Sequence, residues 1–78
     1  MNNTRRKALS MLKDRLEDLK EDLEFLRDEE DDYRSNIPEN LESFQNAEVS
    51  DYCLEAFDEA LDALETALDA IEEIINAS

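Results

Sequence analysis

The sequence predicts an all-α protein, an antiparallel two-helix coiled-coil hairpin that dimerises into a four-helix bundle. Cationic residues recur every seven positions in the first half, at Arg6, Lys13, Lys20, Arg27 and Arg34. Acidic residues recur at the same spacing in the second half, at Asp51, Asp58, Glu65 and Glu72. One antiparallel register brings four oppositely charged pairs together, because the residue numbers of each pair sum to 85. A surface ion pair is worth only about 0.2–1 kcal/mol, so the pairs fix register and direction more than stability.

The first helix is expected from about residue 4 to residue 34, with Thr4 as its N-cap. Neither Gly nor Pro interrupts this stretch. Its apolar residues follow the alternating three- and four-residue spacing of a coiled-coil seam. They are Leu9, Leu12, Leu16, Leu19, Leu23, Leu26 and Tyr33, and Glu30 is the one break in the row.

A connector is expected over residues 35–46. It contains Pro38, the only proline, which stops the first helix and favours an extended backbone at Ile37. A short helical turn at 38–43 would suit a proline in its first turn. The apolar residues Ile37, Leu41 and Phe44 are expected to fold back over the end of the hairpin.

The second helix is expected over residues 47–76, with Asn46 or Ser50 as its cap. Its seam consists of Leu54, Phe57, Leu61, Leu64, Leu68, Ile71 and Ile75. The same fold-back sets this seam against the first one in pairs whose numbers sum to 87, such as Leu19 with Leu68. Glu30 then faces Phe57 as the one mismatch. The charge register and the apolar register agree, which supports one domain spanning residues 1–78.

A second apolar row runs beside the seam of the second helix. It consists of Cys53, Ala56, Ala60, Ala63, Ala67, Ala70 and Ile74. One partner helix cannot cover so wide an apolar arc, and small residues allow another helix to approach closely. The row is therefore predicted to be a dimer or helix interface. A homodimer is the simplest interpretation, and a groove for a foreign helix is the alternative.

The residue types argue against an enzyme. The chain has no His to activate Cys53, so this thiol is interpreted as a small buried residue of the alanine row. The acidic run 28–32 could bind a cation weakly, but a solvated helix end explains it more simply. No cofactor or metal site is expected. With one Cys and no long apolar run, the expected location is the cytoplasm, without membrane contact.

The formal charge of −15 disfavours direct binding to nucleic acid or to anionic lipid. It is uneven, since no Lys or Arg follows Arg34. The predicted ion pairs leave a row of free acids on the second helix. They are Glu55, Glu59, Asp62, Asp69 and Glu73. Such a rigid row can imitate a phosphate backbone and dock on a basic partner. The alternative is a face that only keeps the protein soluble.

Three segments resemble small acidic proteins encoded by phages and integrated mobile elements of Gram-positive bacteria. They are Arg27-Asp28-Glu29-Glu30, the turn Asn36-Ile37-Pro38-Glu39-Asn40-Leu41, and the acidic Ala- and Leu-rich tail. The likeness covers most of residues 5–75 and departs at 42–45, where the family has a more Gly-containing polar stretch. No functional residue carries over from it. It implies a genetic setting in which small acidic proteins often block host nucleic-acid-handling machinery.

These observations predict a non-enzymatic acidic protein-binding module. The leading interpretation is a phage or mobile-element inhibitor that mimics nucleic acid and docks on a basic, nucleic-acid-binding host protein. The alternative is a structural or assembly subunit that acts through the alanine-rich face of the second helix. Reversal of the free acids should disable the first, whereas a bulky charge at Ala60 or Ala67 should disable the second.

Overall fold

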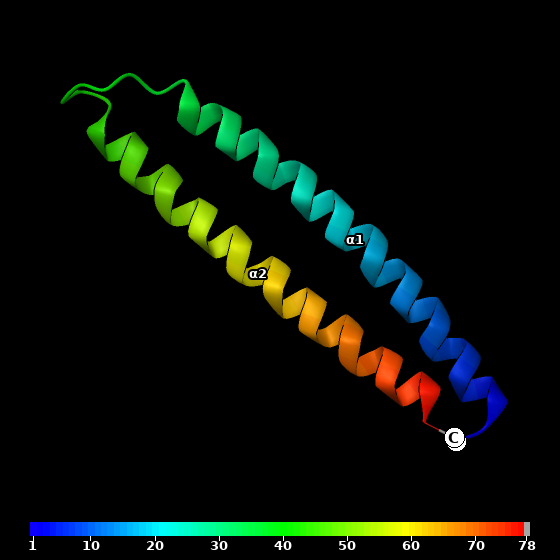
Figure 1. The fold of residues 1–78 in the computed structure, drawn as a ribbon. Coiled ribbons are helices and arrows are strands. Elements are labelled where there is room, and N and C mark those ends of the chain that lie inside the picture. The colour runs from blue at the N-terminus through cyan, green and yellow to red at the C-terminus, as the bar shows by residue number, and fades with distance from the viewer. Residues whose placement is uncertain (78) are drawn as a thin grey trace.

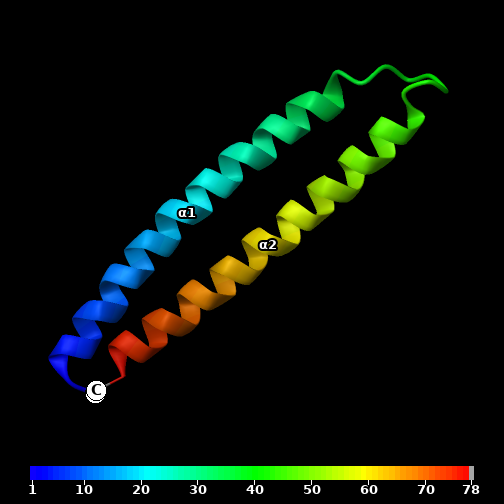
Figure 2. The same ribbon diagram turned by 180° about the vertical axis from the view of Figure 1, so that it is seen from behind.

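The computed structural model describes residues 1–77, and these form a helical hairpin. Helix α1 spans Asn3–Ser35 and helix α2 spans Phe44–Asn76. The two helices lie side by side along their whole length, and the described ends of the chain lie together at the end opposite the connector (Figures 1 and 2). The predicted all-α hairpin is therefore confirmed, with boundaries within about three residues of those expected.

The ends of α1 are fixed by asparagine side chains. Asn2 caps the N-terminus, because its side-chain oxygen accepts a hydrogen bond from the backbone N–H of Arg5 at 2.7 Å. The predicted cap, Thr4, lies inside the helix instead. At the other end Asn36 Nδ2 donates to the carbonyl oxygen of Asp32 at 2.9 Å. This bond satisfies a carbonyl that has no partner within the helix.

The connector is shorter than predicted because α2 begins at Phe44. Asn40 Oδ1 accepts a hydrogen bond from the backbone N–H of Ser43 at 2.9 Å, which closes a turn directly before the helix. The helical turn expected over 38–43 is reduced to a turn over 41–43 that leads into α2. The expected fold-back of apolar residues is correct for Ile37, which is half-buried, and wrong for Leu41 and Phe44, which are 95 % and 58 % exposed.

All four predicted ion pairs form between the helices. Arg34 Nε lies 2.7 Å from Asp51 Oδ1, and Arg27 Nε lies 2.8 Å from Asp58 Oδ1. Lys20 Nζ lies 3.7 Å from Glu65 Oε2. Lys13 Nζ lies 3.5 Å from Glu72 Oε1. The fifth cation of the row, Arg6, donates from Nη2 to the carbonyl oxygen of Ala77 at 3.1 Å. The antiparallel register predicted from the charges is confirmed.

The apolar seam differs from the prediction on α1. Leu9, Leu16 and Leu23 are half-buried, as expected for residues that face α2. The other four apolar positions of α1 stay between 43 % and 59 % exposed within one chain. We call them the leucine row: Leu12, Leu19, Leu26 and Tyr33.

The row of cations explains why α1 is rotated so that its leucine row points away from α2. Lys13, Lys20, Arg27 and Arg34 are all half-buried, because their aliphatic stems cover apolar surface of α2 while their charged ends reach its acids. The helix therefore turns its cations toward α2 and its leucine row away. Among the described residues only Leu68 and Ser50 are buried, at 8 % and 2 % exposed.

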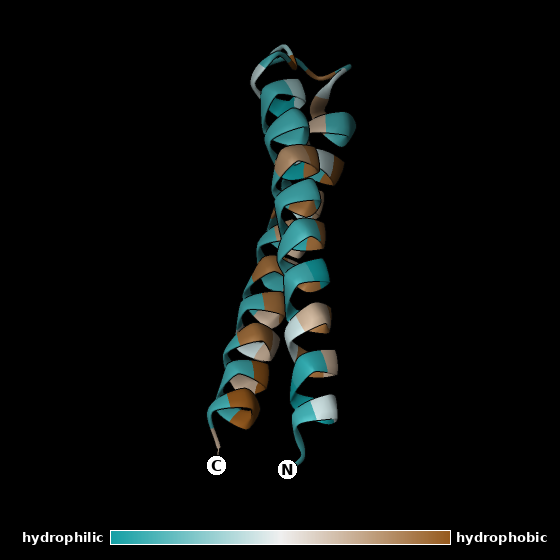
Figure 3. Cartoon of the chain, turned by 90° about the vertical axis from the view of Figure 1, so that its right-hand side faces the viewer, coloured by the Kyte–Doolittle hydropathy of each residue, from teal (hydrophilic) through white to brown (hydrophobic). Residues whose placement is uncertain are grey.

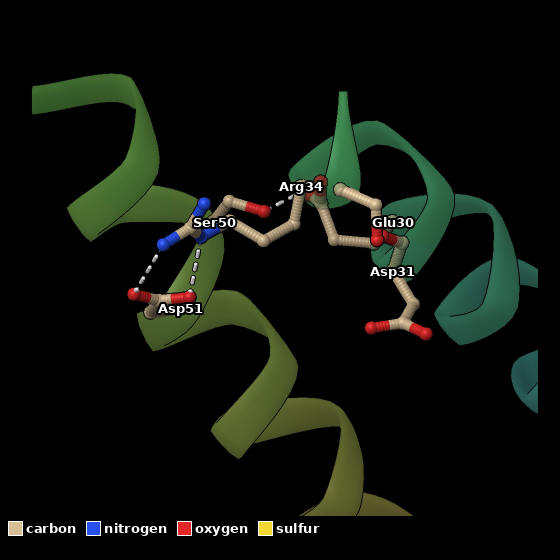
Figure 4. Close-up of polar contacts among 6 residues, drawn as sticks. Glu30, Asp31, Arg34, Ser50 and Asp51 are labelled. Carbon is tan, nitrogen blue, oxygen red and sulfur yellow. Dashed lines mark hydrogen bonds and ion pairs between the residues drawn. The ribbon is translucent and has the colours of Figure 1, made fainter. Parts of the chain in front are cut away.

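Glu30 has a hydrogen-bond partner that the sequence analysis did not assign. Ser50 Oγ donates to Glu30 Oε2 at 3.2 Å, so the serine expected as a possible cap instead pairs across the hairpin (Figure 4). Glu30 also lines a shallow hollow with Phe57, as the mismatched pair predicted. A carboxylate thus occupies a seam position of α1 by bonding to a buried hydroxyl of α2.

Replacing this polar pair by apolar residues should stabilise the hairpin. We expect Glu30→Leu with Ser50→Ala to raise the free energy of unfolding by about 1 kcal/mol or more, because a leucine there covers Phe57 and no polar atom is left unpaired. Urea denaturation followed by circular dichroism at 222 nm measures the change. Ser50→Ala alone, which leaves Glu30 without its donor, should not stabilise. A double variant less stable than the wild type would show that the polar pair itself stabilises the fold.

Candidate partner-binding surfaces

The ion pairs between the helices lie in a row along one side of the hairpin. In contrast to the apolar seam, we call this row the charged seam, and its members are the seam cations and the seam acids. Near the connector Arg34 binds Asp51 through two nitrogens, with Nε at 2.7 Å from Oδ1 and Nη2 at 3.4 Å from Oδ2 (Figure 4). The hydrogen bond that Arg34 donates to Asp51 raises the pKa of Arg34, and the one that Arg27 donates to Asp58 raises the pKa of Arg27. Both guanidinium groups therefore stay charged at any physiological pH.

Each lysine of the seam lies between two carboxylates, one from each helix. Lys13 Nζ is 3.9 Å from Glu17 and 3.5 Å from Glu72. Lys20 Nζ is 3.9 Å from Glu24 and 3.7 Å from Glu65. One positive charge thus offsets only part of the negative charge around it. The seam offsets part of the charge of its own acids and leaves the hairpin strongly acidic on both sides of it.

The free acids predicted on α2 remain unpaired in the structure. All five are exposed, and none makes an ion pair with another described residue. We call them the acidic face: Glu55, Glu59, Asp62, Asp69 and Glu73. Glu55, Asp62 and Asp69 each follow a seam acid by four residues, so they lie one helical turn further along and beside it. Because α2 contains no Lys or Arg, no cation of its own can neutralise them.

Acids of α1 extend this charge across the seam, which the sequence analysis did not note. Glu17 and Glu24 contact the seam lysines from the α1 side. Asp31, seven residues after Glu24, continues their row and is exposed. The signal was present in the sequence, since each of these acids follows a seam cation by four residues. Two roughly parallel rows of carboxylates therefore flank one row of cations.

A second surface is apolar and lies away from the ion pairs. The second apolar row of α2 is hardly covered by α1, since Cys53 is half-buried and the rest of it is exposed. We keep this set as the alanine stripe: Cys53, Ala56, Ala60, Ala63, Ala67, Ala70 and Ile74. The leucine row of α1 is exposed beside it. Apolar segments, drawn in brown, recur along both helices in Figure 3.

The two rows belong to one face of the hairpin. An open hollow of about 420 Å³ is lined by Leu26 and Tyr33 of the leucine row and by Phe57 of α2, with Glu29 and Glu30 completing its lining. Phe57 lies between Cys53 and Ala60 of the alanine stripe along the helix, within one turn of each. The hollow thus bridges the two helices where both expose apolar side chains. We call the leucine row and the alanine stripe together the apolar face.

A separate hollow of about 460 Å³ lies at the connector. Its apolar lining is Pro38, Leu41, Phe44 and Ala47, and its charged lining is Arg34, Glu39, Glu48 and Asp51. Arg34 and Asp51 bind each other, whereas Glu39 and Glu48 make no ion pair with another described residue. The hollow is formed largely by the connector and the first turns of α2.

The described part of the chain contains no cluster of side chains that could hold a metal ion. No three Asp, Glu or Cys side chains come together there as metal ligands. The acidic run 28–32 is exposed except for the half-buried Glu30. Cys53 is a free thiol on the edge of the apolar face. Neither helix contains a stretch apolar enough to cross a bilayer.

No protein-family model, curated protein or solved structure matches this chain significantly. The function of the chain is therefore inferred from its two surfaces. One is a rigid row of unpaired carboxylates, and the other is an exposed apolar face.

Proposed function

We propose that the chain is a non-enzymatic protein-binding module whose acidic face docks on a basic, nucleic-acid-binding surface of another protein. One observation carries the proposal. Every cation that reaches α2 is engaged by the seam acids, which leaves Glu55, Asp62 and Asp69 exposed and unpaired in a regular row. The row is held on a helix, so little conformational entropy is lost when a partner binds it.

The spacing of these charges supports mimicry of nucleic acid. Seam acids and free acids alternate along α2 at intervals of three and four residues, which places one carboxylate per roughly 5 Å of helix axis. A strand of duplex DNA carries one phosphate per about 3.4 Å of axis. A channel lined with Lys and Arg to bind phosphates would meet a similar line of negative charge on the hairpin. Such a partner would be attracted at long range and bind quickly.

Docking of this kind would make the hairpin an inhibitor of its partner. A small protein that occupies the nucleic-acid channel of its target prevents the target from binding DNA or RNA. We infer an inhibitor of nucleic-acid-handling proteins, acting in the bacterial cytoplasm and encoded by a phage or a mobile element. The resemblance of the 36–41 turn and of the acidic tail to such proteins supports this setting.

A competition experiment tests this function. The tagged hairpin is incubated with bacterial lysate at about 50 and 200 mM salt, with and without duplex DNA, and the retained proteins are purified. Each is then bound to a labelled duplex, and fluorescence anisotropy follows its displacement by the hairpin. We expect a basic protein that DNA displaces from the hairpin and that the hairpin displaces from DNA, with affinity for the hairpin falling about tenfold or more at the higher salt. Partners that neither DNA nor salt releases would contradict the proposal.

The exposed leucine row favours a second candidate function. Four large apolar side chains on one face, each roughly half-exposed, are the pattern of a surface that packs on another chain. We propose a homodimer for this face, which would make the protein a structural or assembly subunit. Under this function Ala60→Arg or Ala67→Arg is the disabling change, and reversal of the acidic face is tolerated.

A further inference from the structure

The leucine row and the alanine stripe are level with each other along the hairpin. The ion pairs show that residues whose numbers sum to 85 lie opposite one another. Leu19 and Ala67, Leu26 and Ala60, and Tyr33 and Cys53 each sum to 86, so these three large residues of α1 each lie level with a small residue of α2. The fourth pair, Leu12 and Ile74, joins two large residues at the open end of the hairpin. Both rows repeat every seven residues, so the match continues from turn to turn.

One hairpin exposes more surface than a compact monomer of its mass. One chain of 9.1 kDa exposes 6146 Å². A folded monomer of this mass exposes about 4,900 Å², so the hairpin has an excess of about 1,200 Å². Two copies that each cover this excess would bury about 2,400 Å² together, which is within the range of permanent homodimers. A short peptide would cover much less, so a second copy is the occupant that fits this area.

We infer that two copies pack through the apolar face with their connectors at the same end, so that the leucine row of each chain lies on the alanine stripe of the other. The two-fold axis then runs parallel to the helices, and each α1 lies antiparallel to α2 of the partner as it does to its own. Large side chains meet small ones at three of the four levels, which fills the interface evenly there. With the connectors at opposite ends, leucine would meet leucine and alanine would meet alanine, leaving gaps between the alanine stripes.

This arrangement predicts that the affinity between the two copies rises with salt concentration. The acidic run 28–32 and three further acids, at 39, 42 and 48, lie toward the connector end of the hairpin. Bringing two such ends together causes repulsion, which salt screens. The dimer should therefore tighten as salt rises, whereas docking of the acidic face on a basic protein weakens. The inference rests on the assembly role proposed for the apolar face and is independent of the acidic face.

A mixing experiment tests the arrangement. One variant carries Leu26→Ala and the other carries Ala60→Leu. Each forms a poor homodimer, because the first leaves two holes at one level of the interface and the second places leucine on leucine there twice. In the mixed dimer each leucine at this level meets an alanine. Sedimentation equilibrium and native mass spectrometry of the equimolar mixture should show mainly heterodimer, with a dissociation constant about tenfold or more below that of either variant alone.

The control mixes Leu26→Ala with Ala67→Leu, which has the same substitution types at positions that are not level. No heterodimer preference is expected from it. Wild-type protein should have twice the mass of one chain, which is 9.1 kDa, and dissociate at lower salt. A helical monomer at all concentrations would overturn both the inference and the assembly role. A dimer with no preference in the first mixture would overturn this arrangement alone.

Discussion

Leu68→Ala is expected to be the most damaging single substitution in the chain, costing about 2–5 kcal/mol of stability. Leu68 is the only hydrophobic residue among those described that is buried, at 8 % exposed, and it lies in the C-terminal third of α2. A domain of this length has a total stability of only about 4–12 kcal/mol. The variant should therefore lose a large part of its helical signal well below the unfolding temperature of the wild type.

Leu19→Ala is the matched control, because the seam register places Leu19 level with Leu68 on the opposite helix. Leu19 belongs to the leucine row and is 59 % exposed in one chain. In dilute solution, where the chain is monomeric, its truncation should cost about 1 kcal/mol or less. Thermal and urea denaturation of both variants at low and high protein concentration gives the comparison. Equal costs in dilute solution would mean that the two leucines share one core.

The pairing of the two helices could be predicted from the sequence because charges act at defined spacings. The five cations and four acids at seven-residue intervals form four pairs in two antiparallel alignments, with residue numbers that sum to 85 or to 78. The structure has the predicted first alignment, in which Arg34 pairs with Asp51 and Lys13 with Glu72. Electrostatic patterning thus specifies a partner and a direction even where each pair adds little stability.

The rotation of α1 could not be predicted in the same way. The alternating three- and four-residue spacing predicts equal burial for Leu16 and Leu19. In one chain Leu16 is half-buried and Leu19 is exposed. The long stems of Lys20 and Arg27 bury apolar surface beside their charges, which turns the helix toward its cation row. The exposed Leu41 has a similar origin, because an eight-residue connector closed by the Asn40 turn is too short to fold back.

The acidic face was predictable as a set of exposed acids, because no cation after Arg34 is available to pair with them. The extension of the negative charge onto α1 was not predicted. It arises because Glu17 and Glu24 share the seam lysines with acids of α2. Predicting it requires the helical i,i+4 spacing and the interhelical register together. The polar pair of Glu30 and Ser50 needed the same combination of local and interhelical geometry.

Reversing three acids of the acidic face should abolish docking on the basic partner while the hairpin stays folded. In the variant Glu55→Lys, Asp62→Lys and Asp69→Lys the net charge changes from −15 to −9, since each reversal adds two units. The fold is expected to persist, because each new lysine lies four residues after a seam acid and gains a favourable helical pair. Binding to a nucleic-acid-binding protein should weaken about a hundredfold or more, because attraction becomes repulsion at three points of contact.

A second variant with the same net charge distinguishes the effect of total charge on binding from the effect of where the charge lies. Asp14→Lys, Asp18→Lys and Glu21→Lys reverse three exposed acids of α1 that make no ion pair with another described residue. If the acidic face docks on the partner, this variant should keep its affinity within a few-fold of wild type, since its reversals lie on α1 away from α2. Isothermal titration calorimetry at constant salt measures both variants, and circular dichroism at 222 nm verifies their helices. Equal loss in the two variants would show that the partner senses only overall charge, and full binding by the α2 variant would assign the working surface to the apolar face.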